Sequence, residues 1–236
     1  MKLVVQVPAY NEELHLERAL DDLRSALPLK PFERTEIVVV NDGSADGTLR
    51  AARRAGVRHI VDLPRHRGLG AAFKKGLECG VALDADVIVN TDADGQYRPG
   101  DIPALVRPLL ERRADMVVGS RRFSAIPGYS VCKLASQTGG NLLLSALYGA
   151  AVRDATSGFR AFSRETAELL LARMENDYTY TVESLCLLMK NGKRVSYVPI
   201  HPRRPVRPSR LITSKSYYVW NYLATAFSCL FKGPRR

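Results

Sequence analysis

Residues 90–101 carry acidic and amide side chains at alternating positions. The stretch NTDADGQYRPGD continues the apolar run DVIVN and has Asp92, Asp94 and Gln96 at every second position, where side chains of an extended strand share one face. Two carboxylates on one face repel each other unless a cation lies between them. Oxygen ligands from one segment can hold part of the shell of Mg²⁺ or Mn²⁺ and leave the rest to phosphates and water. The spacing therefore indicates a divalent-cation site, with a solvated Asp-Gly turn as the alternative.

Three further polar loops follow apolar runs in the first half of the chain. They are PAYNE (8–12) after LVVQV (3–7), NDGSADGT (41–48) after EIVVV (36–40), and RHRGLG (65–70) after RHIVDL (58–63). The runs are rich in Val and Ile and do not alternate strictly, which indicates strands buried on both faces. Helix-period stripes of Leu and Ala separate them. Strand and helix in turn predict an α/β fold with a mainly parallel central sheet and helices on both faces.

The polar loops therefore lie at the carboxyl ends of the strands, where such sheets bind their ligands. In NDGSADGT, Asp42 can accept hydrogen bonds from a base or ribose, and Gly43 permits close approach of the backbone. Ser44 or Asp46 can instead cap the helix expected near Thr48. The loop is thus a candidate for nucleotide binding, for helix capping, or for both.

PAYNE carries a similar ambiguity. Asn11 can cap the first helix and Glu12 can favour its N-terminal dipole, whereas Pro8 and Tyr10 have no such role. RGLGAAF is close to the dinucleotide-binding fingerprint, but Phe73 stands where the third glycine should be, and the segment follows the third strand instead of the first. We therefore reject a Rossmann dehydrogenase.

The chain after residue 120 predicts more helix than strand. Helices are expected in KLASQTGGNLLLSALYG (133–149), TVESLCLLMKNG (181–192) and SYYVWNYLATAFSCLF (216–231), and strands in SGFRAF (157–162) and KRVSYVPI (193–200). A Pro- and Arg-rich segment, residues 201–215, precedes the last helix. We expect one main domain at 1–200, followed at 201–236 by a basic connection and an amphipathic helix.

The excess of positive charge lies mainly in that tail. The 236-residue chain has a formal net charge of +11, yet His201 to Arg236 contains eight Lys or Arg residues and no Asp or Glu. Such an excess calls for an acidic partner, which can be a phosphate-rich small molecule, an anionic membrane surface or nucleic acid. The four cysteines have the spacing of neither zinc ligands nor a disulfide framework, and no signal-peptide core follows the first Met. Reduced thiols in a cytosolic protein are therefore expected.

Five motifs, in order, carry a family resemblance. PAYNE, VVVNDGSADGT, RGLGAAFKKGL, TDADGQY and VVGSRRF resemble family 2 glycosyltransferases of the GT-A fold, most closely the dolichol-phosphate mannosyltransferase type that loads a sugar onto a polyprenyl phosphate. The resemblance continues through DATSGFRAFSRE, YTYTVESL and VPI and so spans nearly the whole chain. It implies that residues 1–200 form a GT-A catalytic domain.

The resemblance also implies roles for individual residues. For the nucleotide-diphosphate sugar these are Pro8, Tyr10, Glu12, Asp42, Gly43, Ser44 and Asp92; for Mg²⁺ or Mn²⁺ they are Asp92, Asp94 and Gln96; for phosphates they are Arg121 and Arg160. Asp94, Arg121, Asp154 and Arg160 are the candidate catalytic residues.

The expected reaction is an inverting, metal-dependent transfer of the sugar to a polyprenyl phosphate. Breaking the bond between sugar and diphosphate develops negative charge on the leaving group, which a divalent cation and nearby arginines stabilise. A phosphate acceptor is already anionic at neutral pH and needs no general base, whereas a hydroxyl acceptor would need a carboxylate within hydrogen-bond reach. Asp154 is the candidate base for that alternative, with a structural role at a strand end equally open.

The basic tail fits an acceptor phosphate attached to a membrane. Clusters of Lys and Arg bind lipid phosphates or an anionic leaflet, and the members here are Arg203, Arg204, Arg207, Arg210 and Lys215. We expect Arg204 and Arg210 to contact the acceptor phosphate, with a solvated charge run as the alternative. The sixteen uncharged residues 216–231 are fewer than the roughly twenty needed to span a bilayer, and their Tyr and Trp suit its interface. A peripheral position on the inner membrane face is expected, with a membrane protein as a further candidate partner.

Two other classes of protein compete with this interpretation. A nucleotidyltransferase would also use paired Asp residues on a parallel sheet, but it is expected to carry a Gly-rich, Lys-bearing loop where PAYNE stands. A nucleic-acid-binding protein would explain the basic tail, but it would leave the acidic loop unexplained, and the chain lacks an aromatic-rich sheet motif. Nucleic acid is therefore not an expected partner.

Overall fold

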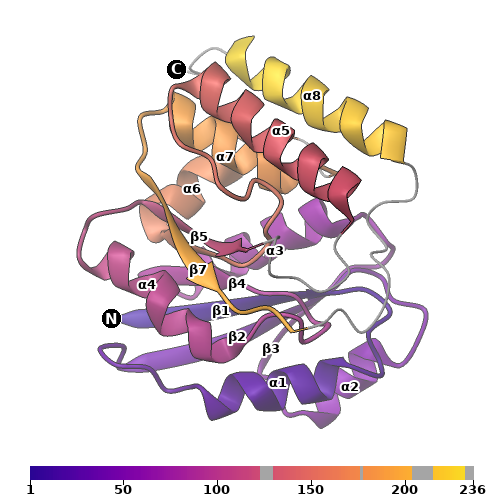
Figure 1. The fold of residues 1–236 in the computed structure, drawn as a ribbon. Helices are drawn as coiled ribbons and strands as arrows, with labels where there is room; N and C mark the ends of the chain where they lie inside the picture. Colours follow the sequence, from indigo (N-terminus) through magenta and orange to yellow (C-terminus); the bar gives the residue numbers. More distant parts are fainter. Residues whose placement is uncertain (123–129, 176–177, 204–214, 232–236) are drawn as a thin grey trace.

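The computed structural model describes residues 1–122, 130–175, 178–203 and 215–231 (Figure 1). Seven strands form its central sheet: β1 Lys2–Ala9, β2 Arg34–Asn41, β3 His59–Asp62, β4 Val87–Asn90, β5 Met116–Arg121, β6 Arg160–Ser163 and β7 Val195–Ile200. The α-helices are α1 Leu16–Ser25, α2 Thr48–Arg54, α3 Leu69–Ala82, α4 Ile102–Leu110, α5 Val131–Tyr148, α6 Arg164–Arg173, α7 Tyr180–Lys190 and α8 Lys215–Phe231, and a short 3₁₀ helix, η1, spans Pro99–Asp101.

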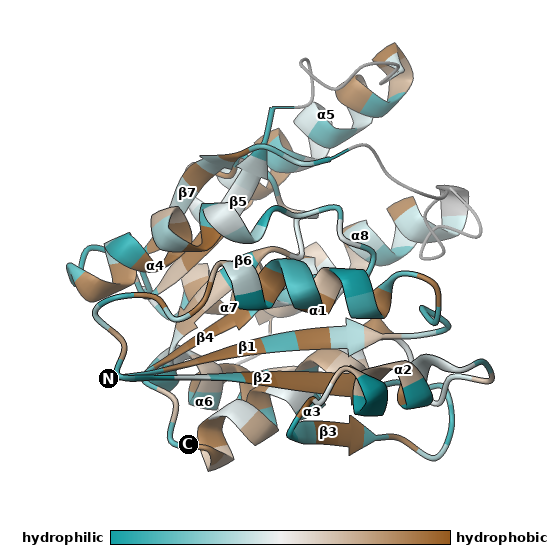
Figure 2. Ribbon diagram, turned by 90° about the horizontal axis from the view of Figure 1, so that it is seen from below, coloured by the Kyte–Doolittle hydropathy of each residue, from teal (hydrophilic) through white to brown (hydrophobic). Residues whose placement is uncertain are grey.

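The sheet is mainly parallel, as the alternation of strand and helix predicts. Its order is β3-β2-β1-β4-β6-β5-β7. β1 pairs in parallel with β2 and β4, β2 with β3, and β5 with β7. Only β6 among the described strands runs the other way, between β4 and β5, because the chain returns to the carboxyl edge through residues 154–159 before β6 begins. In Figure 2 the arrows of β1, β2 and β3 point the same way.

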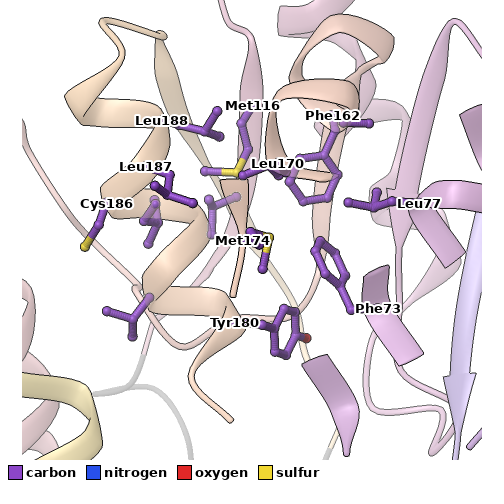
Figure 3. Packing of buried hydrophobic residues seen from close by; sticks show 14 of the residues in the cluster. Phe73, Leu77, Met116, Phe162, Leu170, Met174, Tyr180, Cys186, Leu187 and Leu188 are labelled. Carbon is purple, nitrogen blue, oxygen red and sulfur yellow. The ribbon is translucent and has the colours of Figure 1, made fainter. Parts of the chain in front are cut away.

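Helices cover both faces of the sheet and enclose two clusters of buried side chains. One cluster joins the sheet to α3, α5, α6, α7 and α8, and Figure 3 shows its centre, where Phe73, Phe162 and Tyr180 lie together. The ring centroids of Phe73 and Tyr180 are 4.7 Å apart. The other cluster packs α1, α2 and α4 against the opposite face. Burying one large apolar side chain is worth roughly 1.5–3 kcal/mol, so the two clusters fix the edge that carries the polar loops.

The C-terminal helix α8 is packed against the rest of the protein. Its Tyr222, Ala226 and Cys229 are buried in the first cluster, and the Tyr148 hydroxyl donates to the Ala226 carbonyl at 2.7 Å. A Cβ atom on Gly140 would lie 3.0 Å from the Tyr222 hydroxyl, so this glycine of α5 allows α8 to approach closely. The division of the chain at residue 200 stays a prediction, but α8 shares the core of the main domain.

Along the described part of the chain, no helix has both the length and the apolar character needed to cross a bilayer.

Candidate active site

The predicted site residues come from loops that meet at one edge of the sheet. β1, β2 and β4 are parallel, and β5 runs in their direction because both β4 and β5 are antiparallel to β6. The carboxyl ends of these four strands therefore lie at the same edge, together with the start of β6. The PAYNE loop, the NDGSADGT loop, the TDADGQ loop and Arg121 are brought together there.

Side chains and backbone amides join the first two loops. The amide of Asn11 donates to Ser44 Oγ at 3.0 Å, and Asn11 Oδ1 accepts from the amide of Ala45 at 2.9 Å. Neither Asn11 nor Ser44 therefore caps a helix in these bonds. Asp46 does, because its Oδ1 accepts from the amide of Thr48, the first residue of α2, at 2.9 Å. The two capping interpretations are wrong for Asn11 and Ser44 and right for Asp46.

Asp42 holds the third loop against the second. Its carboxylate is buried and accepts from the amides of Arg67 and Gly68 at 2.8 and 2.9 Å and from His66 Nδ1 at 2.8 Å. Burial raises the pKa of Asp42, and these three interactions oppose that rise. Gly43 has a φ of 61°, and a Cβ atom there would lie 2.2 Å from the Arg65 carbonyl carbon. Glycine is therefore required by the close approach of the two loops.

His66 is a site residue that the sequence did not reveal. Its ring stacks on Tyr10, with centroids 3.7 Å apart and planes 20° apart, beside the carboxylate of Asp42. Such a pair offers a flat surface on which a base can stack. The histidine stands in RHRGLG, where the sequence interpretation rests on the glycines alone.

Asp92 and Asp94 lie close enough to affect each other's charge. Burial first, and then the charge of Asp94, raise the pKa of Asp92 to about 7, and Arg121 opposes the rise. Asp94 Oδ1 also accepts from the amide of Gln96 at 2.9 Å, which fixes the turn. A Cβ atom on Gly158 would lie 3.2 Å from Asp92 Oδ1, so the loop before β6 borders this carboxylate.

This pair has the donor atoms that a divalent cation needs. In the described residues, no group of three or more His, Cys, Asp or Glu side chains is arranged to hold a metal ion alone. Mg²⁺ in nucleotide sites, however, takes only one or two carboxylates and completes its shell with phosphates and water. The mutual repulsion that raises the pKa of Asp92 is what a bound cation relieves. Asp92 and Asp94 therefore fit such an ion, and Gln96 lies two residues further on.

Arg121 is held by Asp154 in a bidentate ion pair. Its Nε lies 2.8 Å from Asp154 Oδ2 and its Nη2 lies 2.9 Å from Oδ1, and the Arg121 amide also donates to Oδ2 at 3.1 Å. Thr156 Oγ1 accepts from Arg121 at 2.8 Å. Asp154 is fully buried, and both of its oxygens are engaged. This geometry fits the structural role for Asp154 better than the role of a general base.

Protein groups enclose Arg160 in this structure, a position that differs from its expected contact with phosphates. It is fully buried. Its guanidinium donates to the carbonyls of Ser157, Thr181 and Ala155 at 2.7, 2.7 and 2.8 Å and to Ser184 Oγ at 2.7 Å. Burial lowers the pKa of Arg160, and the carbonyls compensate its charge. Arg160 joins the loop 155–157 to the start of α7.

A buried network of amide side chains lies next to the Asp92 carboxylate. Gln6 Nε2 donates to Asn90 Oδ1 at 2.8 Å, and Asn90 Nδ2 donates to the Gly158 carbonyl at 2.7 Å. The amide of Gly158 donates to the Tyr97 hydroxyl at 3.3 Å. The network joins β1, β4 and the loop before β6, and its member Gly158 borders Asp92. Its sequence signal was the single amide in the apolar run LVVQV.

One arginine of the basic tail belongs to this site. Arg203 pairs with Asp22 of α1, and its amide donates to the Gln96 carbonyl at 2.8 Å. It therefore fastens the turn at residues 94–96 to α1. Arg204 and Arg210, the residues expected to contact an acceptor phosphate, lie outside the described residues.

The chain matches the model of the family described as Glycosyl transferase family 2 over residues 4–171. It belongs to that family. The match confirms the predicted enzyme class, a glycosyltransferase, over the nucleotidyltransferase and the nucleic-acid-binding protein.

Two curated relatives and one solved structure are similar over most of the chain. The undecaprenyl-phosphate mannosyltransferase of Micrococcus luteus is 32% identical over 212 residues, which are 85% of this chain and 83% of that protein. The UDP-N-acetylglucosamine–dolichyl-phosphate N-acetylglucosaminyltransferase of Methanococcus voltae is 28% identical over 216 residues, 82% of each chain. Glucosyl-3-phosphoglycerate synthase of Mycobacterium tuberculosis, solved with Mn²⁺, UDP and glucosyl-3-phosphoglycerate, has a TM-score of 0.74 at 24% identity and covers 95% of this chain and 79% of its own. The fold is the predicted GT-A fold.

Proposed function

We propose that this family 2 glycosyltransferase moves a sugar, with inversion, from a nucleotide-diphosphate sugar to a polyprenyl phosphate at a membrane surface. The observation that carries the proposal is the meeting, at one sheet edge, of a repelling carboxylate pair with an arginine held by a buried carboxylate. An anionic diphosphate with its cation suits that arrangement. The names of the two relatives supply the acceptor class, a polyprenyl phosphate.

The first two loops would hold the nucleotide. Pro8 lies near the end of β1 and Tyr10 follows that strand. The stacked rings of Tyr10 and His66 lie beside Asp42. A base stacked on this pair would lie within reach of the Asp42 carboxylate, a hydrogen-bond acceptor. Glu12, Gly43 and Ser44 would contribute by holding the loops together, as their contacts with Thr48, Arg65 and Asn11 indicate.

Asp92 and Asp94, with Gln96 beside them, would hold Mg²⁺ or Mn²⁺. When bound, the cation supplies positive charge to the diphosphate as it leaves. Asp92 must lose its proton before it can bind the cation. Because its pKa is raised to about 7, this proton is lost and regained near neutral pH. Asp94 would keep its orientation through the bond from the Gln96 amide.

Arg121 would stabilise the negative charge of the phosphates. Asp154 grips one side of its guanidinium and fixes its direction, so little conformational entropy is lost when a phosphate binds. Asp154 would thus act as a positioning residue. The phosphate acceptor, which is already anionic, attacks the anomeric carbon from the side opposite the leaving group and inverts it, without a general base.

A largely uncharged surface next to the site would keep the protein at the membrane. α5 and α8 lie side by side (Figure 1), and after Lys133 neither helix has a charged residue apart from Lys215 at the start of α8. Val131, Leu142, Tyr217, Trp220 and Phe231 expose large apolar areas along them. Aromatic and aliphatic side chains of this kind bind the boundary between headgroups and acyl chains.

Thermal unfolding with a panel of nucleotide sugars tests the sugar-donor half of the proposal. A bound ligand at one hundred times its Kd stabilises the folded state by roughly 2.7 kcal/mol. We expect one nucleotide sugar to raise Tm in Mn²⁺ but much less in EDTA, and Asp94→Asn to remove the difference. Equal shifts in Mn²⁺ and EDTA would contradict the metal-dependent site.

A further inference from the structure

We propose that the free edge of the sheet at β7 is a docking surface for an extended acidic segment of a partner protein. Among the described strands, β7 pairs with β5 and ends the sheet. Beside it lies a groove of about 700 Å³, lined by β7, by α4 and by residues 150–153. The groove contains none of the candidate active-site residues, so the inference goes beyond the proposed transfer and does not depend on it.

The backbone of β7 offers hydrogen-bonding groups to this groove. Arg194 faces β5, because its amide donates to Asp115 Oδ2 at 2.7 Å and its carbonyl accepts from the Asp115 amide at 2.8 Å. Successive residues of a strand turn their backbone groups to opposite sides, and an edge strand leaves every second set unpaired. Val195, Tyr197 and Pro199 therefore face the groove. Val195 and Tyr197 offer both N–H and C=O there, and Pro199 offers a carbonyl.

The groove is also positively charged. Among the described residues that line it, none is acidic and four are basic: Arg107, Arg113, Arg153 and Lys193. Arg113 pairs with Glu111, and Lys193 pairs with Glu165. Arg107 and Arg153 are exposed, and no described residue forms an ion pair with either. Two uncompensated cations, one on α4 and one before β6, thus flank the strand edge.

Charge and backbone together select the occupant. A second copy of this chain, paired edge to edge, would bring Arg107 and Arg153 against the same cations of its neighbour, and like charges across an interface disfavour binding. A phosphate or a lipid headgroup would meet the two cations but would leave the strand edge unused. An extended peptide satisfies that edge by adding a strand, and its acidic side chains can meet the two cations. The fitting occupant is therefore an extended segment rich in Glu or Asp.

The experiment uses a fluorescein-labelled peptide, EVEVEVE with blocked termini, and the whole protein. We expect saturable binding by fluorescence anisotropy at low salt. Arg107→Glu with Arg153→Glu should weaken it by about tenfold or more, because attraction becomes repulsion. Arg18→Glu with Arg53→Glu, two exposed positions on α1 and α2, makes the same change in net charge and should leave binding unchanged.

Two further measurements separate strand addition from general attraction of anions. A peptide of the same sequence with alternate backbone nitrogens methylated should bind at least about tenfold more weakly, and the unmodified peptide should slow hydrogen exchange at the amides of Val195 and Tyr197. Equal binding of the methylated peptide, or of the charge-reversed variant, would overturn the proposal. The proposal would also be overturned if the variant with Arg107→Glu and Arg153→Glu lost binding to phosphatidylserine vesicles but kept binding to the peptide. That result would assign the groove to a membrane.

Discussion

Asp92 is the residue at which binding and stability oppose each other most directly. Burial and the charge of Asp94 raise its pKa from 3.8 to about 7. Between these values the folded chain keeps a proton that the unfolded chain has lost, so the free energy of unfolding falls as the pH rises through this window. Without a cation, ionised Asp92 is a cost to the fold.

We therefore expect Asp92→Asn to stabilise the metal-free protein while it removes most of the activity. In EDTA at about pH 8, urea unfolding should give a gain on the order of 1 kcal/mol over the wild type, which shrinks as the pH approaches about 4. Turnover with Mn²⁺ should fall by about a hundredfold or more. A variant less stable than the wild type at the higher pH would show that the charge repulsion is not as described.

Arg121 and Asp154 should behave as one unit. If Asp154 positions Arg121, then Arg121→Ala, Asp154→Asn and the double variant should lower kcat/KM by similar factors, because the second change removes nothing further. If Asp154 is instead a base, Asp154→Asn alone should abolish the acidic limb of the pH–rate profile. The double variant should then lose kcat/KM by the product of the two single-variant factors. The measurement is a double-mutant cycle on kcat/KM across the pH range.

Individual residues were predictable from sequence where their spacing within one short motif indicates that their side chains lie together. The alternating carboxylates of TDADGQ needed only their spacing, and the structure brings Asp92 and Asp94 together. Arg160 needed more, because its partners lie in the loop before β6 and at the start of α7, and no local pattern shows that four acceptors surround it. Tyr10 and His66 were likewise separated along the chain and joined only by the fold.

The loop 65–70 depends on Asp42 for its position. Asp42→Ala removes three acceptor contacts at once, so we expect this loop and the stacked His66 to become mobile. The KM for the sugar donor should then rise more than kcat falls, since the loop is assigned to the nucleotide and not to the reacting carbon. Hydrogen exchange at Arg67 and Gly68 should quicken. A lower kcat at unchanged KM would contradict the assignment.

Helix α8 presents different residues to the core and to the surroundings, and substitutions should separate the two. Trp220 and Phe231, which are 70% and 83% exposed, face outward, so changing both to Ser should weaken binding to anionic vesicles by about tenfold or more and leave Tm nearly unchanged. Tyr222→Ala, in the core, should lower stability by roughly 3 kcal/mol or more. Vesicle flotation and urea unfolding measure the two effects. Equal flotation of the Ser variant would remove α8 from the membrane surface.

Elements were predictable where burial sets a simple pattern. The four apolar runs of the first half became β1 to β4 with shifts of a few residues at their ends. The direction of β6 was not predictable, because SGFRAF indicates a strand but not the side from which the chain enters it. Helix α4 was also not predicted, because its sequence contains two prolines. Pro103 lies in the first turn, where proline is tolerated, and Pro108 lies near the end of the helix.

At the scale of the whole molecule, three surfaces carry different chemistry. The carboxyl edge of the sheet gathers Asp42, Asp92 and Arg121, α5 and α8 present apolar side chains, and the β7 edge carries basic ones. The composition indicates a net positive charge, and the distribution of charged residues along the chain places most of it in the tail. The structure adds Arg107 and Arg153 as a second site of that charge on the folded body, which a count along the chain could not reveal because they belong to different elements.

Transfer to a polyprenyl phosphate can be tested in one assay. Purified protein with Mn²⁺ and the nucleotide sugar that stabilises it is given undecaprenyl phosphate in anionic vesicles or, in parallel, soluble sugars, and the glycosylated products are quantified by mass spectrometry. We expect an inverted sugar phosphodiester on the lipid, no product in EDTA, and little product on the soluble sugars. Efficient transfer to a soluble sugar with none to the lipid phosphate would contradict this expectation and would make Asp154 the first residue to test as a base.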